Sequence, residues 1–177
     1  MLTRVAQQSP RLVTHAVYLA AFMPASDTPA AAYFTAPENA GELISGLLQA
    51  DPSVIGALRL DPGSNNLTYR SGLRRTFFGD VKPAIADAAI GLLTPDAPAK
   101  IALGETSLTA DGWGALPRTY VFCSRDMAMR PPLQKRFITE ADAAFPNNPT
   151  SVVTLDASHS PFLSMPRQVA DIVTRLN

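Results

Sequence analysis

The chain has 177 residues, the size of one domain with a buried core. Fifteen Lys and Arg residues balance fifteen Asp and Glu residues, so the chain lacks the basic excess that nucleic acids and anionic membranes attract, and we expect neither as a partner. Charged residues make up only 17% of the chain and hydrophobic residues 46%, which argues against disorder.

The N-terminal part predicts a helix followed by a buried strand. Residues 2–8 have the pattern of a helix tail that ends at Ser9-Pro10. Residues 12–22 are almost continuously apolar and end before Pro24, which predicts a strand buried on both faces, as in a parallel sheet. We assign residues 1–27 to the core.

Residues 28–115 are expected to form a helical insertion into this core. Apolar residues at helical spacing predict helices over 38–49 and 81–93. Residues 53–78 are mixed in character, with turn signals over 61–66.

Residues 116–177 return to the core. They predict alternating strands and helices, namely strands over 119–124 and 151–155 and helices over 133–145 and 166–176. Strands separated by helices predict an α/β fold with about three parallel strands and flanking helices, in one structural domain overall. Asp126 and His159 each lie just past a predicted strand, where functional residues of open α/β sheets collect.

The counts of cysteine and histidine restrict the chemistry. Cys123 is the single cysteine, so no internal disulfide can form, and two histidines give little support to a zinc site. We therefore expect no metal and no organic cofactor. No apolar run approaches the ~20 residues that span a bilayer, and the N-terminus lacks the pattern of a signal peptide, so a cytoplasmic location is expected.

Three stretches carry a resemblance to a known family. They are Ala-Val-Tyr-Leu-Ala-Ala-Phe-Met-Pro at 16–24, Arg-Thr-Tyr-Val-Phe-Cys-Ser-Arg-Asp at 118–126 and Leu-Asp-Ala-Ser-His-Ser-Pro-Phe-Leu-Ser at 155–164. They resemble the α/β-hydrolase fold superfamily, in the branch of methylesterases, hydroxynitrile lyases and bacterial esterases. The resemblance covers nearly the whole chain and implies that residues 28–115 are the helical cap.

The sequence departs from this family at the nucleophile. Family members carry a G-x-S-x-G elbow, and no such motif occurs here. By the resemblance Met1 falls a few residues after the elbow, so we expect a partial α/β-hydrolase fold, its C-terminal half. Five serines of the chain could in principle replace the missing nucleophile, but none lies in a Gly-flanked strand-to-helix turn, so all are poor candidates: Ser9, Ser124, Ser158, Ser160 and Ser164.

The resemblance implies catalytic roles for two residues. His159 matches the base of the catalytic triad and Asp126 the acid that orients it. Asp156, three residues before His159, competes for the acid role. Asp126 is preferred because its motif and its place at a strand end agree. Cys123 is expected to be a small core residue.

Three aromatic residues are candidates for substrate binding. Trp113 could line the cap entrance, and Phe77 and Phe78 could line an acyl pocket. Core packing is the alternative for all three.

The reaction implied by the resemblance is hydrolysis of small carboxylic esters, with an ester-like small molecule as partner. The alternatives are a nucleophile-free binding protein, a lyase or isomerase that uses His159 as a base, and an inactive truncated remnant. Without the neighbouring elbow strand, the edge of the strand at 12–22 is unpaired and apolar. We therefore expect self-association or pairing with a companion segment there.

Overall fold

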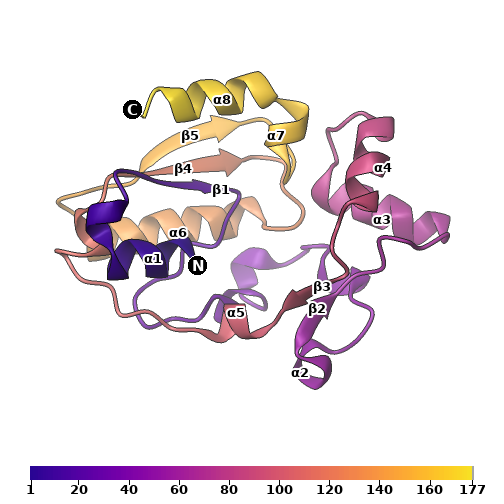
Figure 1. Ribbon diagram of the computed structural model, residues 1–177, viewed down its shortest axis with the longest axis horizontal. Coiled ribbons are helices and arrows are strands. Elements are labelled where there is room, and N and C mark those ends of the chain that lie inside the picture. Colours follow the sequence, from indigo (N-terminus) through magenta and orange to yellow (C-terminus); the bar gives the residue numbers. More distant parts are fainter. Residues whose placement is uncertain (177) are drawn as a thin grey trace.

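A parallel sheet of three strands organises the molecule, which a computed structural model describes over residues 1–176 (Figure 1). The strands are β1 (Ala16–Leu19), β4 (Arg118–Cys123) and β5 (Ser151–Leu155), in the order β1-β4-β5. All neighbours are parallel, and Tyr120 of β4 pairs with Tyr18 on one side and Val152 on the other. The predicted α/β fold with three parallel strands is confirmed.

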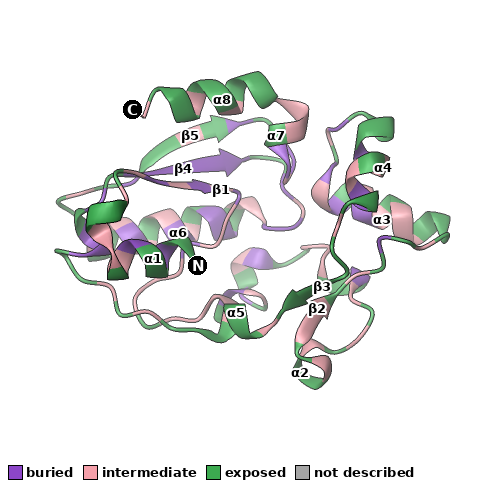
Figure 2. Cartoon of the chain, viewed as in Figure 1, coloured by how far each residue is buried: buried purple, intermediate pink, exposed green. Residues whose placement is uncertain are grey.

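Helices cover both faces of this sheet (Figure 1). They are α1 (Leu2–Gln8) and α6 (Pro131–Ala144) on one face, and α7 (Pro161–Ser164) followed by α8 (Pro166–Thr174) toward the other. Because side chains alternate along a strand, Tyr120 and Phe122 join the α1/α6 side while Val121 and Cys123 join the α8 side. Every residue of β4 is buried, as expected for the central strand (Figure 2).

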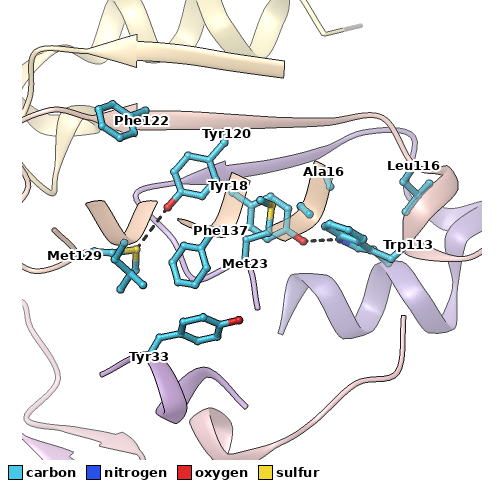
Figure 3. Packing of buried hydrophobic residues seen from close by; sticks show 13 residues of the cluster. Ala16, Tyr18, Met23, Tyr33, Trp113, Leu116, Tyr120, Phe122, Met129 and Phe137 are labelled. Atoms are coloured by element: carbon cyan, nitrogen blue, oxygen red, sulfur yellow. Dashed lines mark hydrogen bonds between the residues drawn. The ribbon is translucent and has the colours of Figure 1, made fainter. Parts of the chain in front are cut away.

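The larger core cluster lies between the sheet and helices α1 and α6 (Figure 3). Two of its aromatic residues are hydrogen-bonded to each other: the Trp113 indole N–H donates to the Tyr18 hydroxyl at 2.8 Å, and that hydroxyl also lies 2.9 Å from Thr3 Oγ1. The guanidinium of Arg118 lies 4.3 Å from the centre of the Trp113 ring. A buried hydroxyl with two partners avoids the cost of an unsatisfied polar group.

Residues 28–115, called the insertion below, leave β1 and return to β4 with a different architecture. Its regular elements are α2 (Pro52–Ile55), β2 (Ala57–Arg59), α3 (Leu67–Phe77), α4 (Pro83–Gly91), β3 (Asp96–Pro98) and α5 (Lys100–Leu103). Strands β2 and β3 form an antiparallel pair, and a second apolar cluster holds α3 against α4. Figure 1 shows α3 and α4 beyond the carboxyl ends of the parallel strands.

The prediction of a helix over 38–49 is wrong. The chain forms two short 3-10 turns there, η3 (Pro37–Asn39) and η4 (Ser45–Leu47). Gly41 has a φ of +81°, outside the helical region, and the Glu42 carboxylate accepts from the N–H of Ile44 at 2.6 Å. A side chain that binds nearby backbone donors competes with helix formation.

The first strand is shorter than the predicted 12–22. A 3-10 turn, η1 (Pro10–Leu12), precedes it, and Ala20 ends it with a φ of +42°. The remaining 3-10 turns are η2 (Ala30–Tyr33) and η5 (Trp113–Ala115). None of the helices in residues 1–176 has the length and apolarity needed to cross a membrane.

Strand β1 stands at the edge of the sheet, because within the described residues it pairs only with β4. A cavity of about 770 Å³ opens beside it. Its lining is mainly apolar and comes from β1, the first turn of α1 and the insertion, with Val17, Leu19, Phe22, Leu58 and Ile101 among the lining residues.

Candidate active site

Asp126 lies in the loop that follows β4 and is fixed by the backbone of its own loop. Its side chain is fully buried. Oδ1 accepts hydrogen bonds from the N–H groups of Ala128 at 2.8 Å and Met129 at 2.9 Å. Two backbone donors on one carboxylate oxygen fix the orientation of the carboxylate and leave the second oxygen, Oδ2, for another partner.

That partner is His159, in the loop that follows β5. Its Nδ1 lies 2.8 Å from Asp126 Oδ2. An ionised carboxylate only accepts hydrogen bonds, so Nδ1 is the donor and the lone pair of a neutral ring is on Nε2. No group of residues 1–176 hydrogen-bonds Nε2, and the side chain is 26% exposed. The ring is therefore oriented on one side and open to a reactant on the other.

Gln134 of α6 braces the loop that carries Asp126. Its fully buried amide accepts from the N–H of Cys123 at 3.0 Å, and its NH₂ group donates to the carbonyls of Cys123 and Met129 at 3.1 and 2.9 Å. The amide thereby ties the end of β4 to both the far side of the loop and the helix. Its position on the apolar stripe of α6, three and four residues before Phe137 and Ile138, is the sequence signal that could have identified it.

The loops after β4 and β5 are also bonded to each other. The N–H of Ser124 donates to the Leu155 carbonyl, and the N–H of Arg125 to the Ala157 carbonyl, both at 3.0 Å. Asp156 contacts Ser124 Oγ at 2.9 Å and Arg125 Nε at 3.0 Å, and its side chain is 78% exposed. The carboxylate that contacts His159 is thus that of Asp126, the preferred candidate, and not that of Asp156.

Of the three aromatic candidates, only Phe77 lies against the His159 ring. Their ring centres are 5.7 Å apart in an edge-to-face arrangement. Phe78 is buried in the second apolar cluster, inside the insertion. Trp113 is 1% exposed, with its indole packed against Tyr18, Arg118 and Phe145, so it has no free surface for a substrate. For Phe78 and Trp113, core packing is therefore what the structure supports.

None of the hydroxyls considered as replacement nucleophiles is bonded to His159 within residues 1–176. Ser124 binds Asp156, Ser158 binds Asp80, and Ser164 Oγ is buried without a partner. Burial, together with the nearby carboxylates of Asp126 and Asp80, raises the pKa of the Cys123 thiol to about 12. The thiol is therefore protonated at neutral pH and is no nucleophile.

The cavity beside β1 and the His159–Asp126 pair occupy different places, because neither residue lines that cavity. The described part of the chain also contains no cluster of three or more His, Cys, Asp or Glu side chains that could hold a metal ion. His159 and Asp126 supply an imidazole oriented by a buried carboxylate.

The parallel sheet defines an α/β protein, and the two adjacent loops at its carboxyl edge bring a carboxylate and a histidine into contact. Comparison with known proteins then specifies the family. Residues 2–172 match the family model described as the alpha/beta hydrolase family, and the chain belongs to this family.

Curated relatives and solved structures agree with this assignment. The chain is 29% identical over 137 residues to the alpha/beta hydrolase nvfD of Aspergillus novofumigatus, covering 77% of this chain and 50% of that protein. It is 32% identical over 75 residues to methylesterase 9 of Arabidopsis thaliana, covering 41% and 27%. The chain thus spans half or less of these relatives.

The solved structures support the fold. A pyrethroid hydrolase from Sphingobium faniae JZ-2 superposes with a TM-score of 0.75 at 22% identity, covering 98% of this chain and 64% of that one. Polyneuridine aldehyde esterase superposes with a TM-score of 0.71 at 17% identity, covering 99% and 66%.

Proposed function

We propose that the chain supplies the acid–base part of a site that hydrolyses small carboxylic esters. The observation that carries this proposal is the 2.8 Å contact between His159 Nδ1 and the buried carboxylate of Asp126, with Nε2 left open. The similarity to a relative named methylesterase supports an ester as the substrate class.

In this proposal His159 is the base and Asp126 the orienting group. Nε2 takes the proton from a serine hydroxyl as that hydroxyl attacks the ester carbonyl, and returns it to the leaving alcohol. Asp126 holds the neutral ring with its proton on Nδ1 and stabilises the imidazolium that forms. The exposed part of Phe77, beside the ring, lines the acyl side of the substrate.

The proposal is tested by complementation, because the proposed nucleophile is not among residues 1–176. The chain is mixed with a second polypeptide that carries the Gly-x-Ser-x-Gly segment of a relative, and hydrolysis of p-nitrophenyl acetate is followed. We expect activity only from the mixture, and a fall in kcat of about 10⁴-fold for Asp126→Asn and at least as much for His159→Ala.

The matched control for His159→Ala is His15→Ala, which removes the other histidine. His15 contacts Thr119 Oγ1 at 2.9 Å, away from the proposed pair. Equal loss of activity in both variants, or full activity of the complemented His159→Ala protein, would refute the assignment.

A second candidate is a nucleophile-free protein in which His159 acts only as a base on a bound small molecule. The absence of any hydroxyl bonded to Nε2 within residues 1–176 favours it. A fluorophosphonate probe separates the two functions, because it labels an activated serine in the complemented hydrolase and leaves a nucleophile-free site unmarked.

We propose further that the free edge of β1 pairs with another strand, from a second copy or from a companion segment. Residues 16 and 20 direct their N–H groups to β4, so by the period of a strand residues 17 and 19 direct theirs to the free edge. Donors without a partner among residues 1–176, beside an apolar cavity, favour strand addition.

Size-exclusion chromatography with light scattering, which measures the mass of the eluting protein, tests this pairing. The chain alone is expected above its monomer mass of 18.9 kDa, and Val17→Pro is expected to restore the monomer. Proline removes one free-edge donor and no bond to β4, which an edge strand tolerates. A monodisperse monomer of the unaltered chain would count against the proposal.

A further inference from the structure

Asp80 is a nearly buried carboxylate whose contacts lie outside its own segment. It belongs to the turn between α3 and α4 of the insertion, and its side chain is 8% exposed. Oδ1 accepts a hydrogen bond from the hydroxyl of Ser158. Oδ2 is buried, has no hydrogen-bond partner among the described residues and lies 3.7 Å from Arg125 Nη2.

Both partners of Asp80 are chain neighbours of the proposed catalytic pair. Ser158 precedes His159, and Arg125 precedes Asp126. The two partners come from different loops of the core, so a single carboxylate from the insertion contacts the loop of the base and the loop of the acid. A charge-assisted hydrogen bond to a buried hydroxyl is among the stronger bonds a side chain makes.

The turn that carries Asp80 is closely packed on the loop of His159. A Cβ atom at Gly79 would lie 3.6 Å from Ser158 Cβ and 3.4 Å from the Arg75 carbonyl oxygen. Phe77, two residues before Gly79 in the sequence, contacts the His159 ring. Residues 77–80 therefore hold the histidine loop by a ring contact and by a carboxylate.

We propose that Asp80 is a positioning residue, which fixes the His159 and Asp126 loops relative to each other through Ser158 and Arg125. It touches neither ring nitrogen nor a reacting atom. Its effect on the pair is indirect: a fixed Ser158 backbone limits the motion of His159 away from Asp126 Oδ2. A role for Asp80 in catalysis rests on the proposed hydrolytic function, whereas its role in holding the two loops together does not.

The test uses the whole chain and observes the imidazole directly. The chain has two histidines, so ¹⁵N-imidazole NMR resolves both rings, and His15 serves as an internal reference. A proton held between Nδ1 and a carboxylate is shifted downfield and exchanges slowly. We expect Asp80→Ala to accelerate the exchange of the His159 Nδ1 proton about tenfold or more, and to leave the His15 signals in place.

Three variants separate positioning from general stability. Asp80→Asn keeps an acceptor for Ser158 and is expected to have a smaller effect than Asp80→Ala. Ser158→Ala breaks only the bond to the His159 loop, and is expected to accelerate the exchange in the same direction as Asp80→Ala and by no more than that variant. Asp156→Asn removes a carboxylate that contacts Arg125 without contacting Ser158, and is expected to leave the Nδ1 proton unchanged.

The outcomes are decisive in both directions and independent of hydrolysis. An unchanged Nδ1 proton in Asp80→Asn and Ser158→Ala would overturn the proposal, and so would an equal effect of Asp156→Asn or the lack of a slow proton in the unaltered chain. If Asp80→Ala does not fold, Asp80→Asn and Ser158→Ala still decide. Failure of the esterase assay alone would refute the proposed function and leave the positioning role intact.

Discussion

Substitution of the buried Gln134 tests how the loop that carries Asp126 is held in place. Replacing Gln134 with leucine keeps the volume and removes all three hydrogen bonds. The Cys123 carbonyl keeps a longer bond from the Asp126 N–H at 3.4 Å, so two backbone groups, the Cys123 N–H and the Met129 carbonyl, lose the bond they make to the amide. At about 1–3 kcal/mol for each unsatisfied buried group, Gln134→Leu should lower the free energy of unfolding by about 2–6 kcal/mol.

Urea unfolding followed by circular dichroism measures this difference, provided that the m-value is unchanged. Gln168→Leu is the matched control, since Gln168 lies exposed on α8, and it should change stability by less than about 0.5 kcal/mol. Gln134→Glu should be at least as destabilising as Gln134→Leu, because it buries a carboxylate that faces the Cys123 and Met129 carbonyl oxygens without a donor for either. Equal stability of Gln134→Leu and Gln168→Leu would refute the idea that the amide supports the loop.

Two further predictions concern the core. Tyr18→Phe leaves two buried groups, the Trp113 N–H and the Thr3 hydroxyl, without their shared partner, so at about 1–3 kcal/mol each the free energy of unfolding should fall by about 2–6 kcal/mol; an unchanged urea midpoint would contradict this account of the cluster. Cys123 should react with Ellman's reagent only after unfolding, because it is fully buried and its pKa is raised to about 12; stoichiometric reaction of the folded chain at pH 8 would contradict it.

Strong periodicity made part of the fold predictable. The strand expected over 151–155 has those bounds in the structure, because turn residues flank a β-branched run. The helix expected over 133–145 is α6, Pro131–Ala144, since its apolar stripe faces the sheet. Where the apolar spacing was interrupted by glycines, over 38–49, the prediction failed, because local side-chain bonds replaced the helix.

Other elements lacked a signal in the local sequence. Helix α3 is mostly polar and buries only Leu73 and Thr76, so its apolar face is too narrow to indicate a helix. Its N-cap, Asn66, ends a segment, 61–66, whose residues are typical of turns. The β2–β3 pair joins segments of three residues each that lie far apart in the chain. No local pattern specifies such a pairing, which depends on tertiary contacts.

The sequence indicated Asp126 and His159 more clearly than it indicated Gln134 and Asp80, the residues that hold their loops. Strand ends placed Asp126 and His159 at one edge, and the family resemblance assigned their roles. Gln134 carried a signal, a polar residue on an apolar stripe. Asp80 carried none, because its partners Ser158 and Arg125 are distant in sequence and only the docking of the insertion brings them together.

The free edge of β1 gives the proposed function a geometric requirement. Neighbouring strands lie about 4.8 Å apart, so a strand bonded to β1 would lie about 10 Å from β4 across the sheet. The carboxyl ends of parallel strands meet at one edge, so a parallel addition would direct the residue after that strand to the edge that holds His159 and Asp126. An antiparallel addition would bring an amino end there instead. A partner that pairs with β1 therefore completes the proposed site only in one direction of pairing, and assembly without activity is the expected result of the other.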